Sequence, residues 1–336
     1  MTPKLKFQPV SHSWVALHPQ PKGVIQFIGG AFFGTFAPMF FYRYLLQYLF
    51  NRGYTIILLP FNFTFNHYVE AGFLIKEEYK VTPELIRMAK LANYEYKVYL
   101  EDKNFSWIGH SIGCKYIALL EGFTELLEHQ ADMEDFIRKI VIEGNPKADK
   151  VEIDRKTQRI FADIKRLINE VEKEKRTAIE LSSYYLGEQK DIFSNLFIKG
   201  QTSVLLAPVN SGTDSAIPPI IAQFIDKLGW GVKPSTEETY ALIRVTNLFN
   251  LLGLVKFKSD KIALKTVDWF RKTFHKPPVE LENTLSGGHL KPLGFQVGNY
   301  VINFPDSLPI IQSTQRRSSE FESYVDKLLE ILEQKR

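Results

Sequence analysis

The sequence predicts a mostly parallel α/β sheet with helices on both faces, and three observations carry this prediction. Short apolar runs such as Val24–Ile28 and Thr55–Pro60 have the length and composition of buried strands. Longer stretches with helical spacing separate these runs. The apolar run Phe105–Ile108 leads into Gly109-His110-Ser111-Ile112-Gly113 and then into a helical pattern. Alternating strands and helices of this kind form a doubly wound sheet.

The first half of the chain is expected to provide most of this sheet. Trp14–Leu17 and Val24–Ile28 are predicted to pair as a hairpin across the Pro- and Gly-rich residues 18–23. The further elements expected are Met39–Phe50 (helix), Thr55–Pro60 (strand), Pro83–Glu101 (helix), Phe105–Ile108 (strand), Cys114–Leu120 (helix) and Lys139–Ile142 (a short buried strand).

The pattern changes after residue 150, so the chain is divided into residues 1–150, 151–250 and 251–336. Ile153–Leu186 is charged and helical, and we interpret residues 151–250 as a helical lid inserted into the core. The alternative is a solvated pair of amphipathic helices without a gating role. Thr202–Pro208 has the pattern of a strand, but its position in the sheet is not predicted. The later elements expected are Leu251–Phe257 (strand), Ile262–Phe274 (helix), Val279–Thr284 (last strand) and Ser318–Lys335 (helix).

Composition excludes some function classes. The 336 residues carry 42 basic and 38 acidic side chains, and a net charge of +4 is too small to indicate nucleic-acid binding. The single cysteine, Cys114, suits a reducing compartment, and residues 1–14 lack the apolar core of a signal peptide, so a cytoplasmic location is expected. Glycine and proline interrupt the uncharged stretch Gly23–Tyr42, so no transmembrane span is predicted. Peripheral membrane contact through its phenylalanines stays open.

The motif Gly109-His110-Ser111-Ile112-Gly113 predicts a nucleophile elbow. In a strand-turn-helix context, the G-x-S-x-G pattern holds a serine on a strained turn. A side chain at either glycine would collide with a neighbouring strand or helix. The turn directs Ser111 Oγ out of the sheet, towards the N–H groups at the start of the next helix.

A serine hydroxyl needs a base and an orienting acid, and this chain offers both in the order Ser, acid, His. Asp260 follows the predicted strand Leu251–Phe257, and His289 follows the last strand. The alternatives are that Asp260 only caps the next helix and that His289 is an ordinary loop histidine. Glu143 and Asp214 are the reserve acids.

Other residues are candidates for the oxyanion hole and for substrate contacts. The N–H of Ile112 is one candidate donor, and Gly30 or Ala31 in the loop after Val24–Ile28 supplies the second. Phe32 and Phe33, among other loop phenylalanines, line an apolar pocket in this interpretation, although most such residues are simply core. His67 is a further candidate contact. His110 is another, although the side chain before the nucleophile normally packs away from it. No phosphate-binding, dinucleotide-binding or metal-ligand motif occurs, so no cofactor and no metal are expected.

Five segments resemble one known family of cyanobacterial and plastid proteins, catalogued as domain of unknown function 1350. The segments are FIGGAFFGTFAPMFFYRYLLQYLFNRGYTIILLPF, WIGHSIG, LLAPVNSGTDSAIP, VKFKSDKIA and SGGHLKP. The resemblance implies an α/β-hydrolase fold with Ser111, Asp260 and His289 as its Ser-Asp-His set, and a cyanobacterial cytosol or plastid stroma as the location. It implies no particular substrate. Asn66-His67 stands where the family is expected to have an Asp-His pair.

Two functions follow as hypotheses. The first is a serine hydrolase, or acyltransferase, acting on an ester or thioester of an apolar, lipid-like acyl group. The second is a non-catalytic scaffold or binding protein of the same fold, with a vestigial triad and a role in plastid or thylakoid assembly. Hydrogen bonds from His289 to Ser111 and to Asp260 would favour the enzyme, and a filled cleft would favour the scaffold.

Overall fold

The computed structural model describes residues 3–62, 64–187, 200–210, 232–297, 300–303, 311–313 and 317–336. Within them the main sheet has eight strands in the order β1-β2-β4-β3-β5-β6-β7-β8. Only the β1–β2 and β2–β4 pairs are antiparallel, which confirms the mostly parallel, doubly wound sheet. The strands are β1 (Gln8–Val10), β2 (Ser13–Ala16), β3 (Gly23–Ile28), β4 (Tyr54–Leu58), β5 (Phe105–His110), β6 (Thr202–Leu206), β7 (Leu252–Phe257) and β8 (Glu282–Leu285).

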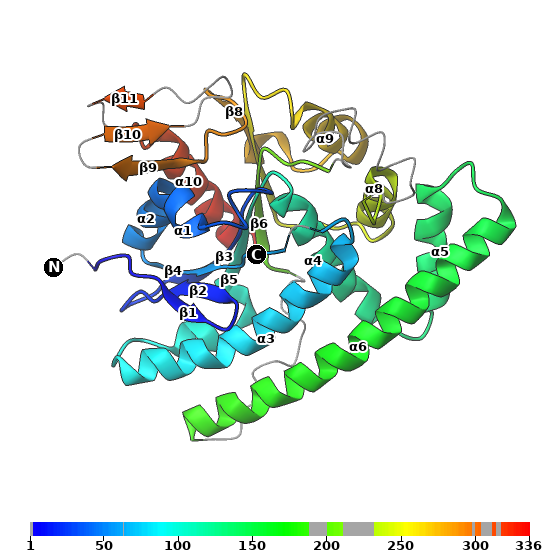
Figure 1. Cartoon of the computed structure of the whole chain (residues 1–336), viewed down its shortest axis with the longest axis horizontal. Coiled ribbons are helices and arrows are strands. Elements are labelled where there is room, and N and C mark those ends of the chain that lie inside the picture. Colours follow the sequence, from blue (N-terminus) through cyan, green and yellow to red (C-terminus); the bar gives the residue numbers. More distant parts are fainter. Residues whose placement is uncertain are drawn as a thin grey trace.

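Helices cover both faces of this sheet (Figure 1). One face carries α1 (Pro38–Phe41), α2 (Arg43–Asn51) and α10 (Glu320–Lys335). The other face carries α3 (His67–Leu91), α4 (Gly113–Glu128), α8 (Thr236–Val245) and α9 (Leu264–Trp269), with α5 (Met133–Gly144) and α6 (Lys150–Leu186) outside them. Shorter turns form at Lys97–Leu100, Asp102–Asn104, Phe270–Phe274 and Val279–Leu281. Every residue of the central strands β3 and β5 is buried, as expected for parallel strands covered on both sides.

A second, small sheet lies beside α1 and α2, and the sequence patterns did not predict it. Its strands are β9 (Gly294–Val297), β10 (Tyr300–Asn303) and β11 (Ile311–Ser313), in the antiparallel order β11-β10-β9. β9 contacts both α1 and α2, which places this sheet next to the loop that follows β3 (Figure 1).

The predicted hairpin between the first two runs is wrong. β2 pairs antiparallel with β4, with Trp14 opposite Leu58, and not with β3. β3 has parallel neighbours on both edges, β4 and β5, so it offers no free edge to β2.

The strand predicted at Lys139–Ile142 is also wrong, because these residues belong to helix α5. Ile140 and Val141 are buried whereas Ile142 is 50% exposed, which is the helical pattern of one apolar face. A four-residue apolar run fits a strand or a helix equally well, and contacts with α6 and α8 decide here. Glu143 therefore follows no strand and pairs instead with Arg244. The other reserve acid, Asp214, lies outside the described residues.

Helix α3 starts sixteen residues earlier than predicted and keeps Pro83 in its interior. The Asn66 side chain accepts a hydrogen bond from the N–H of Val69, so Asn66 caps this helix. Proline is commoner in the first turn of a helix than in its interior, and for this reason the sequence predicts a helix start at Pro83.

The range 151–250 is not purely an insertion. α6 packs along α3 and α5, outside the main layers, but β6 is paired between β5 and β7 in the middle of the sheet (Figure 1). The strand pattern at Thr202–Pro208 thus finds its place in the core. The role of α6 as a lid stays a prediction.

The uncharged stretch Gly23–Tyr42 forms β3, a loop and α1. Among the residues that the structure describes, no helix is both long and apolar enough to span a membrane.

Candidate active site

Ser111 occupies a strained turn between β5 and α4. Its φ is 56°, a left-handed value that non-glycine residues rarely adopt. A Cβ at Gly109 would lie 2.7 Å from Ile117 Cδ1, and one at Gly113 would collide with the carbonyl oxygens of Ile28 and Gly29. Both glycines are therefore required for the close approach of α4 to the ends of β3 and β5, as the motif predicts.

The segment after β6 braces this turn from one side. The Ser111 N–H donates to Leu206 O at 3.0 Å, and the Val209 N–H donates to Ser111 O at 3.1 Å. The sequence pattern of this segment predicts a strand but not its neighbours in the sheet, so it indicates no role at the elbow. These backbone bonds help to hold Ser111 in its strained conformation.

The structure brings Ser111, His289 and Asp260 together. His289 Nε2 lies 2.9 Å from Ser111 Oγ, and His289 Nδ1 lies 2.9 Å from Asp260 Oδ2. The side chains of His289 and Asp260 are 6% and 2% exposed, so their hydrogen bond is shielded from water. Both distances are within the reach that proton transfer from a serine to a histidine requires.

Asp260 combines the two alternatives that the sequence left open. Its Oδ2 atom meets His289, while Oδ1 accepts the N–H groups of Ile262 and Ala263 at 2.8 and 3.0 Å, at the entry to α9. Burial opposes ionisation, but the hydrogen bond from His289 and the two backbone N–H groups outweigh it and hold the Asp260 pKa below its ordinary value. This carboxylate is therefore oriented by α9 and stays charged.

One candidate oxyanion donor is engaged elsewhere. The Gly30 N–H donates to Tyr42 Oη at 2.7 Å, so in this structure it does not fit the role of oxyanion donor expected for it. The Ile112 N–H follows Ser111 at the start of α4, and the structure gives it no hydrogen-bond partner among the described residues. Ile112 and Ala31 thus remain as the candidate donors.

Tyr42 and His110 extend this contact into a hydrogen-bonded chain. Tyr42 Oη lies 2.8 Å from His110 Nδ1, and His110 Nε2 lies 3.0 Å from the carbonyl oxygen of His289. Because an N–H can only donate, Tyr42 Oη accepts from Gly30. Because a carbonyl oxygen can only accept, the proton of His110 lies on Nε2, and Tyr42 Oη donates its own proton to Nδ1. His110 then carries its proton on Nε2 and donates it to His289. One arrangement of protons satisfies every bond.

The same chain corrects the expectation that His110 contacts a substrate. Its side chain is 1% exposed and both ring nitrogens are bonded within the protein. Burial, together with nearby His289, lowers the pKa of His110 to about 3, which keeps the ring neutral and the chain intact. The sequence patterns do not single out Tyr42 as a site residue. Its only signal there is a hydroxyl at the start of an apolar helix.

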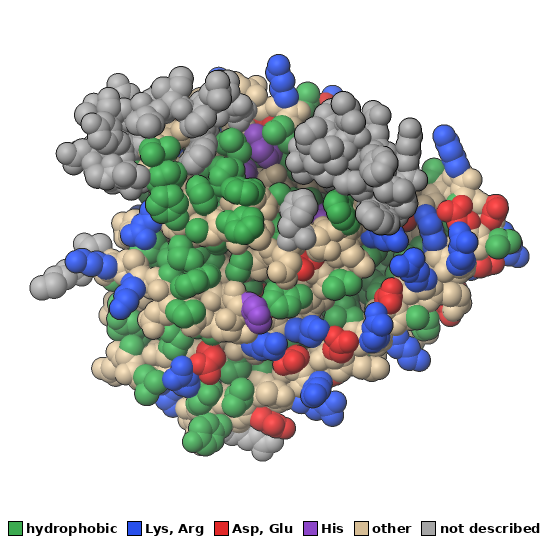
Figure 2. All heavy atoms as spheres, in the orientation of Figure 1, with side chains coloured by type: hydrophobic (Ala, Val, Ile, Leu, Met, Phe, Trp, Pro, Cys, Tyr) green, Lys and Arg blue, Asp and Glu red, His purple; other side chains and the backbone are tan. Residues whose placement is uncertain are grey.

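Aromatic side chains cluster on the loop that begins at Gly30 and on the helix after it. Ring centroids lie 5.4 Å apart for Phe32–Phe33, 4.8 Å for Phe33–Phe41 and 4.0 Å for Phe40–Phe295. Phe32 is 61% exposed and Phe40 is 42% exposed, whereas Phe33 is half-buried against the core. Figure 2 shows hydrophobic side chains gathered on this face over α1 and α2. An apolar surface therefore adjoins the candidate oxyanion loop.

His67 lies beside the first turn of α4. It starts α3, is 6% exposed, and its ring lies 5.1 Å from that of Tyr116. Burial and the charge of Lys115 lower the pKa of His67 to about 3. Among the described residues, no hydrogen bond or ring contact links His67 to Ser111. Asn66 before it performs the helix cap that an aspartate would perform equally well.

Within the described ranges, no group of three His, Cys, Asp or Glu side chains is arranged to hold a metal ion.

The sheet order, the serine elbow after β5 and the acid and histidine after β7 and β8 define an α/β-hydrolase fold. Residues 6–134 match the family described as "Protein of unknown function (DUF1350)", which confirms the family that the sequence resembles. The match covers less than half of the chain. No curated protein matches the sequence significantly.

Solved structures similar to this chain include esterases. Esterase B from Lactobacillus rhamnosis (HN001) has a TM-score of 0.41 at 10% identity, covering 96% of this chain and 81% of its own. The same esterase inhibited by a tributyrin phosphonate has a TM-score of 0.41 at 9% identity, with the same coverage. Carboxyl esterase 2 from the fungus Tuber melanosporum has a TM-score of 0.34 at 11% identity, covering 82% of this chain and 71% of its own.

Proposed function

We propose that this protein is a serine hydrolase that cleaves an ester or thioester of an apolar acyl group. The observation that carries the proposal is the continuous hydrogen-bonded line from Asp260 through His289 to Ser111, with both distances at 2.9 Å. The strained φ of Ser111 also supports it, because such strain persists where a function needs the side chain in one position.

The proposed reaction has two halves. Ser111 Oγ attacks the acyl carbonyl carbon as its proton passes to His289 Nε2, and the N–H groups of Ile112 and Ala31 hold the negative oxygen. The bond to the leaving oxygen or sulfur then breaks, and the imidazolium returns the proton to it. Water repeats the sequence on the acyl-serine and releases the acid. Transfer of the acyl group to another acceptor is a variant of the second half.

Asp260 has a positioning and an electrostatic part in this reaction. Its Oδ2 atom keeps the proton of His289 on Nδ1, so that Nε2 is free to accept the serine proton. The low pKa of Asp260 means that the carboxylate stays charged and stabilises the imidazolium as it forms.

The apolar acyl group is inferred from the aromatic cluster. Phe32, Phe33 and Phe40 lie on the loop and helix that follow the candidate oxyanion donor Ala31, so an acyl chain held there would leave water for aromatic surface.

Covalent labelling by a fluorophosphonate probe tests the proposal. We expect the purified protein to be labelled and the Ser111→Ala variant to remain unlabelled, because the probe reacts with an activated serine. Labelling should then be prevented by prior incubation with the preferred ester or thioester in a series of increasing acyl length. A folded wild-type protein that is not labelled would contradict the proposal and favour the non-catalytic scaffold.

A further inference from the structure

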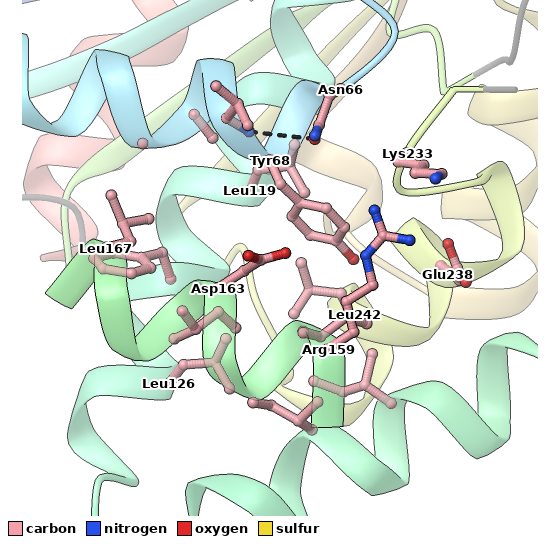
Figure 3. A pocket seen from close by; sticks show the side chains of 18 of the residues that line it. Asn66, Tyr68, Leu119, Leu126, Arg159, Asp163, Leu167, Lys233, Glu238 and Leu242 are labelled. Carbon is pink, nitrogen blue, oxygen red and sulfur yellow. Dashed lines mark hydrogen bonds between the residues drawn. The ribbon is translucent and has the colours of Figure 1, made fainter. Parts of the chain in front are cut away.

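A cavity of about 1170 Å³ lies behind α4, on the side away from the sheet. Helices α3, α5, α6 and α8 enclose it together with α4 (Figure 3). Its floor is apolar and combines side chains from four helices, among them Leu119, Phe123, Ile140, Ile164 and Leu242. The volume is that of a pocket for a small organic ligand.

The charged side chains around this cavity do not balance. Three of the cations are paired: Lys76 with Glu170, Lys156 with Glu238 and Arg166 with Asp163. The other three cations that line it, Arg155, Arg159 and Lys233, have no ion pair among the described residues. Among the described residues, three positive charges thus have no acidic partner at the rim of an apolar cavity.

These unpaired cations are placed to act together. Arg155 and Arg159 are four residues apart on α6, so they project from the same face of that helix. In Figure 3 the side chains of Arg159 and Tyr68 point towards one another inside the cavity, and Lys233 lies across from them. A guanidinium pair and a phenol beside an apolar floor suit an anionic headgroup with a hydrocarbon chain.

The cavity is separate from the candidate active site. Leu119 is eight residues beyond Ser111, which corresponds to about 12 Å along α4. Lys115 lies on α4 between Ser111 and Leu119. Its side chain is 2% exposed and donates a hydrogen bond to Pro234 O at 2.8 Å. A ligand in the cavity therefore does not occupy the place of an acyl group on Ser111.

We propose that this cavity binds a single-chain anionic amphiphile. The hydrocarbon chain lies on the floor formed by α4, α5, α6 and α8, and Arg155, Arg159 and Lys233 hold the headgroup. Carboxylate and phosphate headgroups share this chemistry, and the experiment below separates them. The site is independent of the proposed hydrolysis, because it uses no residue of the Ser111 group.

Binding is best measured on the full-length Ser111→Ala variant, in which turnover of the ligand at Ser111 is excluded. The probe is the fluorescent carboxylate dansyl-undecanoate, at low ionic strength and below its micelle concentration. The competitors are dodecanoate, dodecyl phosphate and dodecanol. We expect the two anions to displace the probe and dodecanol to compete at least about tenfold less well, because a charged hydrogen bond is lost. The stronger of the two anions identifies the headgroup.

Two pairs of variants locate the site. Arg155→Ala combined with Arg159→Ala should weaken probe binding at least about tenfold, whereas Arg176→Ala, exposed on the same helix, should not change it. Leu242→Trp fills the cavity and should abolish binding, whereas Leu264→Trp, on the exposed side of α9, should not. The arginine variants change only exposed residues, so they decide the test even if Leu242→Trp does not fold.

Three results would each overturn the proposal. One is the absence of probe binding, and another is equal competition by dodecanol and dodecanoate. The third is unchanged binding in the double arginine variant.

Discussion

Tyr42 joins two parts of the candidate site through one oxygen atom, and His110 extends this connection to a third part. It accepts from Gly30 in the oxyanion loop and donates to His110 in the elbow, and His110 in turn holds the backbone of His289. All of these side chains are buried, so an unmade bond would leave a polar atom without water. Tyr42 is thus a positioning residue that sets the oxyanion loop and the histidine loop relative to Ser111.

We predict that Tyr42→Phe slows fluorophosphonate labelling at saturating probe by at least about tenfold, since a misplaced oxyanion donor costs more than this in other enzymes. The probe concentration for half-maximal rate should change little, because the binding surface is retained. The free energy of unfolding should fall by about 1–3 kcal/mol, the cost of buried polar groups left unpaired.

Tyr184→Phe is the matched control for this prediction, because Tyr184 is 81% exposed and far along α6. It should leave both the labelling rate and the stability unchanged. If Tyr42→Phe lowers stability but labels at the wild-type rate, Tyr42 has a structural role only.

At the scale of elements, the elbow depends on how closely α4 approaches β3. The first residue of α4 is Gly113, and its Cα faces the carbonyl oxygens of Ile28 and Gly29, which are backbone atoms and cannot turn away. By contrast, a Cβ at Gly253 in β7 would meet only methyl groups of Leu328 and Leu332, at 3.2 and 3.3 Å.

We therefore predict that Gly113→Ala lowers the free energy of unfolding by about 3 kcal/mol, since it forces backbone segments apart, and that it abolishes labelling of Ser111. Gly253→Ala should cost less than half as much and leave labelling intact, because leucine side chains can adjust. Chemical denaturation of both variants checks the difference. Equal stabilities would show that α4 is free to shift away from β3.

At the scale of the whole molecule, a buried carboxyl group lies between the sheet and α3. Glu78 is 3% exposed, and it faces the side-chain amide of Gln26 on β3. With the amide nitrogen of Gln26 turned towards this carboxyl group, Nε2 donates to Glu78 Oε1 at 2.9 Å. Burial, with the negative charges of Glu77 and Asp102, raises the Glu78 pKa well above its ordinary value.

This carboxyl group should make the protein less stable as the pH rises. Its pKa is ordinary in the unfolded chain and raised in the folded one, so between those values the folded state binds more protons. Glu78→Gln keeps the shape and an acceptor oxygen for Gln26 without the charge. We predict that it stabilises the protein above neutral pH and flattens the dependence of the unfolding free energy on pH.

Glu84→Gln, on the same helix but half-buried beside Arg87, is the control and should keep the wild-type pH dependence. Urea unfolding from pH 5 to pH 8 provides the measurement. A Glu78→Gln variant whose stability parallels the wild type over this range would show that Glu78 is ionised in the folded protein.

The predictable parts of this protein are those in which a local rule suffices. Short β-branched runs such as Val24–Ile28, which end at glycines, favour covered strands, and the G-x-S-x-G motif carries its own steric requirement through Gly109 and Gly113. The order Ser111, Asp260, His289 places each candidate at the carboxyl end of a parallel strand, where such ends share one edge of the sheet. Proximity of the three side chains follows from that topology.

Long-range contacts decide what the sequence by itself leaves open. β2 pairs with β4 because β4 and β5 already pair with both edges of β3. Lys139–Ile142 is helical because of its packing on other helices. The engagement of Gly30 by Tyr42 and the position of Arg155 and Arg159 beside an apolar cavity arise from elements brought together in space. Sequence alone thus determined most strands of the main sheet, the elbow and the order of the reactive groups, because periodicity and steric fit act between near neighbours. Strand pairing, proton positions and the cavity were decided by the tertiary structure, because they depend on the distances between residues far apart in the chain.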